Sequence, residues 1–210
     1  GYHVQFLDKK GLAIRNGGVF SQLVFMRSDK EAKVTAEGGS MPKVVAGAAG
    51  SGVPAVVTTP LVPYGKADLL LGIDLVEAVR GIDPSQPYRV ASPEHTAAVI
   101  NTAKTPTILT LMGRDDFAVD DLERTLARYT KPEHSFSFNI GDLCERVLDT
   151  KLYANIMMLG IAFQKGYLPL TGEAIEKAIG IVCRDEADRN LRAFKIGRKI
   201  AVQPELFVVE

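Results

Sequence analysis

A short apolar run passes directly into a helix-like segment between residues 67 and 81, and this pairing restricts the fold more than any other part of the chain. Ala67 to Ile73 is mostly apolar and has the length of a strand. Asp74 to Arg80 then follows a helical pattern, which Gly81 ends. A strand followed by a helix is the unit from which parallel sheets covered by helices are built. The sequence therefore predicts an α/β fold.

Other strand-like and helix-like stretches surround this unit. Val19 to Met26 predicts a buried strand, because Val, Phe and Leu favour strands. The remaining predicted strands are Tyr2–Leu7, Ala97–Ile100, Thr107–Leu111 and an extended piece at Ser135–Asn139, and a helix is predicted at Asp120–Tyr129. Because strands alternate with helices, we expect a mainly parallel sheet flanked by helices, in three α/β/α layers.

The last third of the chain is almost entirely helical by pattern. The predicted helices are Gly141–Leu148, Leu152–Lys165, Gly172–Cys183 and Asp185–Ile200. Thr171 is the expected N-cap of the third of these helices. We therefore predict one domain, with a sheet portion at 1–135 that carries a long loop at 28–66, and a helical portion at 136–210 packed on it.

The charges of the chain balance, with 25 Lys and Arg against 25 Asp and Glu. A neutral chain has no overall field that attracts nucleic acid or an anionic membrane, so neither is an expected partner. The basic residues of the last helix alternate with acidic ones, which predicts a solvated or ion-paired helix face. The apolar runs are too short to span a bilayer and no leader pattern opens the chain, which favours the cytoplasm.

A glycine-rich segment at 47–52 is the part of the sequence most similar to a phosphate-binding loop. Its spacing differs from GxGxxG, and the helix that should follow would contain Pro54 and Pro60. A proline inside a helix costs about 3 kcal/mol, so a flexible or partner-ordered loop is the favoured interpretation. A nucleotide-dependent oxidoreductase remains the alternative that this segment supports.

Residues that bind metals or thiamine are sparse. Cys144 and Cys183 lie in separate helical stretches, where buried structural thiols are expected. The three histidines are far apart in sequence and are predicted to be surface or satisfied residues: His3, His95 and His134. Asp142 follows Gly141 without the second glycine of a thiamine motif, so we predict a solvated residue at a helix start. The sequence thus predicts no catalytic residue, metal site or cofactor of its own.

Several segments, in order along most of the chain, resemble the gamma subunit or domain of the 2-oxoacid:ferredoxin oxidoreductases, and most of all the indolepyruvate branch. They are residues 7–21 (LDKKGLAIRNGGVFS), 67–75 (ADLLLGIDL), 99–102 (VINT), 155–166 (NIMMLGIAFQKG), 190–194 (NLRAF) and 197–198 (GR). The resemblance begins after the glycine-rich strand-to-helix unit with which the gamma part of this family normally opens.

The resemblance implies an enzyme assembly that oxidatively decarboxylates a 2-oxoacid such as indolepyruvate or pyruvate, forms an acyl-CoA and reduces ferredoxin. Thiamine diphosphate, iron-sulfur clusters and coenzyme A would then belong to partner subunits or domains, and ferredoxin would be reached through the complex. The isolated chain is expected to be inactive. A noncatalytic scaffold or binding module of the same fold is the second alternative.

Within this interpretation, one loop is expected to face the partner or its cofactor. Paired glycines let a backbone approach another surface closely, and nearby cations suit a carboxylate or phosphate. The proposed loop residues are Gly11, Arg15, Asn16, Gly17, Gly18 and Ser21. Three polar residues of the helical portion could also be functional, but anchoring of helix packing is the favoured prediction for them: Asn155, Gln164 and Asn190.

Overall fold

The computed structural model describes residues 2–9, 20–27, 61–83, 89–104 and 118–208. The chain divides into two compact units, one made of residues 1–8 and 21–62 and the other of residues 9–20 and 63–210. The first unit contains the pairing of β1 (Tyr2–Lys9) with β2 (Phe20–Arg27) in a two-stranded sheet. None of the helices in the described segments is long and apolar enough to cross a membrane.

Apolar side chains lie on one face of this two-stranded sheet. Tyr2, Val4 and Phe6 alternate along β1 and are 40%, 45% and 59% exposed. The ring of Tyr2 meets Phe25 of β2 edge to face, with centroids 6.2 Å apart. In β2, Ser21 and Leu23 are exposed, so the prediction of a buried strand over Val19–Met26 is wrong in its burial, although the strand exists. Two paired strands do not by themselves enclose a core.

The second unit is built on a parallel sheet with the order β3-β4-β5. Its strands are β3 (Leu69–Gly72), β4 (Ala97–Asn101) and β5 (Ser135–Phe138). Leu69 is opposite Ala97, and Ala98 is opposite Ser135. All five residues of β4 are buried, as expected for a central strand that is covered on both faces.

One face of this sheet is covered by α1 (Leu75–Arg80) and α3 (Val119–Tyr129). Ala98 and Ile100 of β4 pack there against Leu75 of α1 and Leu126 of α3. Asp74 begins α1 by accepting a hydrogen bond from the backbone N of Glu77 at 3.0 Å. The strand-to-helix unit predicted at residues 67–81 is thus confirmed.

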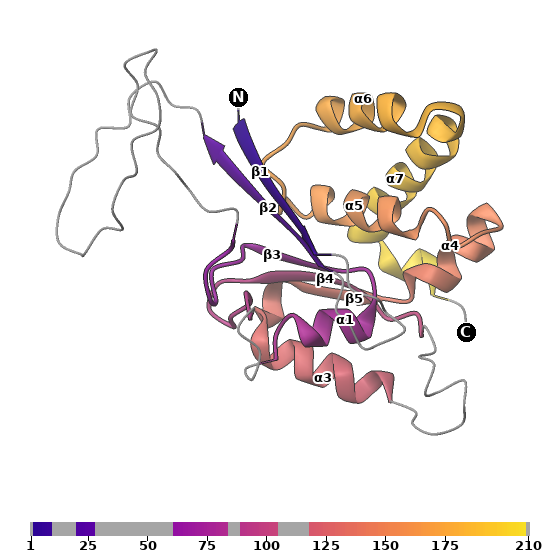
Figure 1. Cartoon of the computed structure of the whole chain (residues 1–210). Helices are drawn as coiled ribbons and strands as arrows, with labels where there is room; N and C mark the ends of the chain where they lie inside the picture. Colours follow the sequence, from indigo (N-terminus) through magenta and orange to yellow (C-terminus); the bar gives the residue numbers. More distant parts are fainter. Residues whose placement is uncertain (1, 10–19, 28–60, 84–88, 105–117, 209–210) are drawn as a thin grey trace, which may run out of the picture. The chain divides into compact units, whose positions relative to one another are not determined.

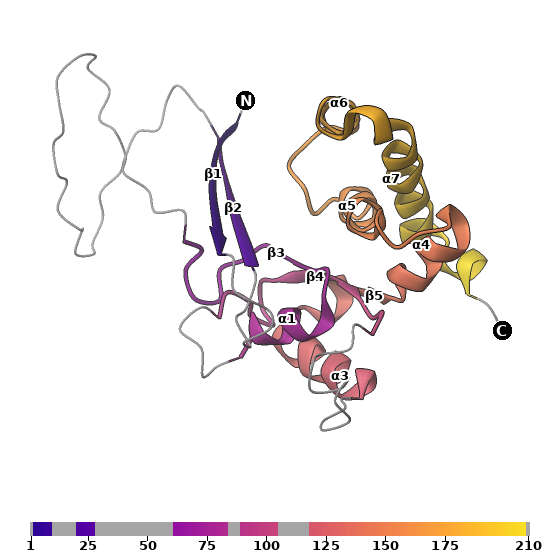
Figure 2. The same cartoon turned by 45° about the vertical axis from the view of Figure 1, so that its right-hand side comes forward.

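The opposite face is covered by helices of the last third of the chain, as Figures 1 and 2 show. These helices are α4 (Ile140–Leu148), α5 (Ala154–Gln164) and α7 (Ala187–Val202), and α6 (Gly172–Cys183) packs on α7. Val99 points to this side, where it joins Leu143 and Met157 in the largest core cluster. The three-layer α/β/α arrangement is confirmed.

Short 3-10 turns complete the second unit, η2 (Pro132–His134) before β5, η3 (Arg184–Glu186) before α7 and η4 (Pro204–Phe207) near the end. The Thr171 hydroxyl caps α6 by accepting from the backbone N of Ala174 at 3.2 Å, as predicted. The predicted strand Thr107–Leu111 and most of the predicted loop 28–66 lie outside the described residues.

Candidate functional site

The loop predicted to face a partner joins the ends of β1 and β2. Five of its six proposed residues lie outside the described residues: Gly11, Arg15, Asn16, Gly17 and Gly18. Ser21 is described, and its Oγ donates a hydrogen bond to Asp8 Oδ1 at 2.8 Å. The Nζ of Lys9 lies 5.6 Å from the centroid of the Phe20 ring. These contacts hold the adjoining ends of β1 and β2 together.

A buried amide in β2 was not predicted from the sequence. Gln22 is 8% exposed, and its Oε1 accepts a hydrogen bond from the backbone N of Val62 at 2.7 Å. This bond joins β2 to a segment that follows it by 40 residues. A polar residue in an apolar stretch is the only sequence signal of such a tether, and it does not reveal the partner.

The carboxyl ends of parallel strands are the usual place for ligands in α/β proteins. Here the last residue of β4, Asn101, is 7% exposed and occupies that edge. Its Nδ2 donates to the backbone O of Ile73 at 3.0 Å, and its Oδ1 accepts from the backbone N of Ala103 and of Gly141, both at 3.1 Å. One side chain therefore joins the segments that follow all three strands.

The start of α4 lies at the same edge and is occupied by its own polar residues. Asn139 Oδ1 accepts from the backbone N of Asp142 at 3.1 Å, and Asn139 Nδ2 donates to Asp142 Oδ2 at 2.8 Å. Lys151 Nζ donates to Asp142 Oδ1 at 2.9 Å. The bonds from Lys151 and Asn139 hold the pKa of Asp142 below its usual value, and bonding to Asp142 and Glu145 raises the pKa of Lys151. Asp142 is an exposed residue in the first turn, as predicted, and it is ion-paired.

These contacts determine what the carboxyl edge can bind. A helix N-terminus attracts anions through backbone N–H groups that have no partner within the helix. At α4 the N–H groups of Gly141 and Asp142 donate to the side-chain oxygens of Asn101 and Asn139, and that of Leu143 donates to the backbone O of Asn139. A phosphate could use these donors only by displacing both asparagines.

The histidines and cysteines do not gather into a metal site in the described segments, where no group of three or more His, Cys, Asp or Glu side chains is close enough to hold an ion. His95 Nε2 lies 2.9 Å from Asp68 Oδ1 at the surface, and the His134 ring packs edge to face on Tyr167. Cys144 is fully buried, and desolvation raises the pKa of its thiol. Cys183 is half-buried.

The three polar residues predicted to anchor helices make different contacts in the structure. Gln164 Oε1 accepts from Arg198 Nε at 2.9 Å and so joins α5 to α7, which confirms its predicted role. Asn190 is buried, and its Nδ2 donates to the backbone O of Glu186 at 2.8 Å, which ties α7 to the turn before it. The prediction is wrong for Asn155, an exposed residue whose Oδ1 accepts from the backbone N of the next residue.

Comparison with known proteins gives one relative with a described activity. The chain is 26% identical over 148 residues to the indolepyruvate oxidoreductase subunit IorB of Archaeoglobus fulgidus, a match that covers 70% of this chain and 69% of that protein. No protein-family model matches the chain. The similarity supports a distant relationship between this chain and the Archaeoglobus subunit.

Proposed function

We propose that this chain is a gamma-type subunit or domain of a thiamine-dependent 2-oxoacid:ferredoxin oxidoreductase that acts on indolepyruvate or a similar 2-oxoacid. The observation that carries the proposal is the similarity to the indolepyruvate oxidoreductase subunit over 70% of the chain. In this proposal the assembly decarboxylates the oxoacid, forms an acyl-CoA and passes electrons to ferredoxin.

The position most similar to a thiamine motif, Asp142, is poorly suited to hold thiamine diphosphate. The cofactor's diphosphate is held through a metal ion, which requires free carboxylate and amide oxygens. Both carboxylate oxygens of Asp142 are already bonded, one to Lys151 and one to Asn139. The amide oxygen of Asn139 accepts from the start of α4. We therefore assign the thiamine centre to a partner chain.

An iron-sulfur cluster likewise does not fit, because a cubane or rhombic cluster is held by four cysteines and the whole chain has two. Cys144 is enclosed in the main core cluster, and Cys183 packs against the separate cluster between α6 and α7. The two thiols thus belong to different clusters of the core. Electron transfer in the proposed assembly is assigned to partner chains.

The contribution proposed for this chain is a surface next to the partner's reaction centre. Segment 10–19 begins and ends where the Ser21–Asp8 hydrogen bond holds β1 and β2 together. Its paired glycines give the backbone room to approach another chain, and Arg15 supplies a cation for a carboxylate or phosphate. The chain would then shape and close a site whose reacting groups belong to the partner.

Purification of the native assembly tests this proposal. We expect a tagged copy of the chain, expressed in its source cell, to co-purify with a chain that contains thiamine diphosphate, iron and sulfide. Thiamine fluorescence and metal analysis of the purified assembly are the measurements. Recovery of the chain with partners that contain neither thiamine nor iron would contradict the proposal and favour a noncatalytic scaffold.

The isolated chain gives a second measurement. We expect no ferredoxin reduction with indolepyruvate or pyruvate and coenzyme A when the purified chain is assayed alone, and activity when the partner chains are added. Turnover by the pure chain would contradict the assignment of the reaction centre to a partner. Tight binding of NAD or FAD to the isolated chain, measured by calorimetry, would instead favour the nucleotide-dependent oxidoreductase.

A substitution in the predicted loop tests its role in assembly. Gly17→Val adds a branched side chain where close backbone approach is proposed, so it should lower assembly or activity about tenfold or more and leave the melting temperature of the isolated chain almost unchanged. Gly180→Val is the matched control, since a Cβ at this exposed helical glycine meets no atom within 4 Å. If the complex containing Gly17→Val were fully active, the loop would not be part of the proposed interface.

A further inference from the structure

The basic residues of α7 separate into two groups in the structure. The neighbouring Tyr153 hydroxyl and Glu186 carboxylate raise the pKa of Arg189. Arg198 donates to Gln164 and approaches Glu176 Oε1 at 3.9 Å. These two arginines therefore interact with residues of this chain, on α5, on α6 and in the turn before α7.

The other group consists of Arg192, Lys195 and Lys199, which we call the basic stripe. The spacing of three and four residues places them along one side of α7. All three are exposed, and within the segments that the structure describes no hydrogen bond or ion pair holds them. The buried side of the helix is formed by other residues, such as Ala193, Phe194 and Ile200.

The stability of the helix does not account for this stripe. Like charges three or four residues apart repel one another and weaken a helix slightly. Lys199 lies in the last turn, where a cation complements the helix dipole, but Arg192 and Lys195 lie in the middle of α7. The helix dipole therefore does not stabilise α7 through Arg192 or Lys195.

Apolar side chains continue the surface at the end of α7. Val202, the last residue of the helix, is 62% exposed, and Leu206 in the following turn is 68% exposed. We propose that the basic stripe, together with Val202 and Leu206, is a docking surface for an acidic protein surface that carries apolar residues beside its carboxylates. Cations that lack internal partners and an adjacent apolar patch are complementary to such a partner.

A protein partner suits these residues better than the other polyanions. Single-stranded nucleic acid is bound by basic grooves with stacking aromatic rings, whereas the stripe has none and ends in aliphatic side chains. A helix that lies in a membrane surface inserts its own apolar face, and the apolar face of α7 is buried against α5 and α6. The inference goes beyond the proposed function and depends on it only for which partner chain is tested.

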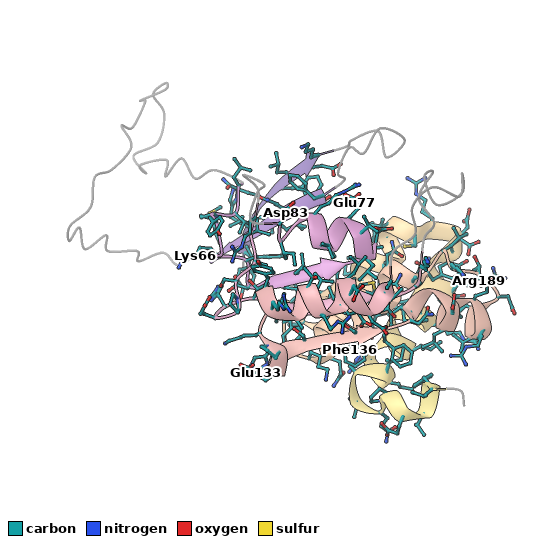
Figure 3. The ribbon with its side chains drawn as sticks, turned by 90° about the horizontal axis from the view of Figure 1, so that it is seen from below. Lys66, Glu77, Asp83, Glu133, Phe136 and Arg189 are labelled. Carbon is teal, nitrogen blue, oxygen red and sulfur yellow. The ribbon has the colours of Figure 1, made fainter. Side chains whose placement is uncertain are left out.

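Zero-length carbodiimide crosslinking of the native assembly tests the contact directly, because this reagent joins a lysine amine only to a carboxylate that touches it. We expect Lys195 and Lys199 to be joined to Asp or Glu residues of a partner chain and Lys66 and Lys177 to be unjoined. Lys66 serves as a control because it lies far from α7, as Figure 3 shows with Lys66 and Arg189 at opposite ends. Crosslinks from Lys66 or Lys177 alone, or none to a partner, would overturn the inference.

Charge reversal gives an independent measurement. The triple variant Arg192→Glu, Lys195→Glu, Lys199→Glu should bind the partner chain about tenfold or more weakly, with the loss falling as salt is raised. The control variant Lys66→Glu, Arg128→Glu, Lys177→Glu changes the net charge equally at exposed positions elsewhere and should bind normally. Circular dichroism should show both variants folded. Equal weakening by the two variants, or charge-dependent binding of the chain to duplex DNA or phosphatidylserine vesicles instead, would overturn the inference.

The two proposals can fail separately. Crosslinks from the stripe to a partner that contains no thiamine would support the docking surface and contradict the proposed oxidoreductase. A thiamine-containing assembly in which the stripe is not crosslinked would support the proposed oxidoreductase and contradict the docking surface.

Discussion

At the scale of single residues, the described sheet is held at its carboxyl edge by one amide. Asn101 makes three hydrogen bonds, to Ile73, Ala103 and Gly141. The side chain at this position must donate one hydrogen bond and accept two, and the amide of asparagine or glutamine does both. The short side chain of asparagine also fits beside Gly141, where an added Cβ would come within 2.7 Å of the Ala103 Cβ.

Asn101→Ala should therefore be strongly destabilising. The substitution leaves the buried groups of Ile73, Ala103 and Gly141 without their partner, and we expect the free energy of unfolding to fall by about 2–4 kcal/mol. Asn155→Ala is the control, because that exposed amide bonds only to its neighbour, and its effect should stay within about 0.5 kcal/mol. Urea denaturation followed by circular dichroism measures both. A mild effect of Asn101→Ala would mean that water replaces the amide.

Local patterns in the sequence predicted some of these residues and could not predict others. Asp74 and Thr171 cap helices that begin directly after them, so the signal and its effect lie within three residues. Two of the three partners of Asn101 are 28 and 40 residues away, and those of Gln164 and Gln22 are 34 and 40 residues away. A sequence pattern identifies a polar residue in an apolar context but does not show which distant group it meets.

At the scale of helices and strands, the pairing of α5 with α7 depends on two glycines. A Cβ at Gly160 would overlap the backbone carbonyl of Phe194, and a Cβ at Gly197 would overlap that of Met157. Each glycine thus lets the backbone of the other helix approach without an intervening side chain. Because α5 is apolar on most sides and carries Met157 and Ile161 in the core, this close approach fixes the centre of the largest core cluster.

Gly197→Ala should force α5 and α7 apart. We expect the free energy of unfolding to fall by about 3 kcal/mol, since an added carbon that meets backbone cannot be relieved by a side-chain rotation. Gly180→Ala places the same methyl group on exposed α6 with nothing near it, and should raise stability by up to about 1 kcal/mol. Thermal melts should show a lower melting temperature for Gly197→Ala and a higher one for Gly180→Ala than for the unchanged chain. A stabilising Gly197→Ala would contradict the close helix contact.

The helices themselves were well predicted from the sequence, and their packing was not. The predicted segment Gly172–Cys183 agrees with α6 at both ends, and Leu152–Lys165 exceeds α5 by only a few residues. Apolar spacing and caps are local, so they determine where a helix lies in the chain. The choice of α7 as the partner of α5 depends on the matching positions of Gly160 and Gly197, which are 37 residues apart in sequence.

At the scale of the whole molecule, the apolar core belongs to one of the two units. Among the described residues, the members of the three core clusters all lie between Leu69 and Phe207. The parallel sheet and its helices were predicted because alternating strands and helices have few alternative arrangements. The burial of β2 was not, because Phe and Val in a two-stranded sheet have the same pattern as in a central strand. The residues of the predicted partner-facing loop lie mainly outside the described part of the chain.

The location of the described core predicts that residues 63–210, the larger part of the second unit, fold without the preceding residues. A segment that contains its own core is able to fold alone, and no described residue before position 63 belongs to the three clusters. We expect the fragment to unfold cooperatively, with the near-UV and far-UV circular dichroism signals melting together. Its helix content per residue should rise, since β1 and β2 are absent.

The same fragment separates folding from assembly. It keeps the basic stripe on α7 and lacks the loop at residues 10–19, so it should fold yet fail to restore ferredoxin reduction when it replaces the full chain with the partner subunits. A matched full-length chain carrying Gly180→Val controls for the handling of the mixture. If the fragment melted without cooperativity, the first unit would be needed for the core, and if it restored full activity, segment 10–19 would have no role at the proposed reaction centre.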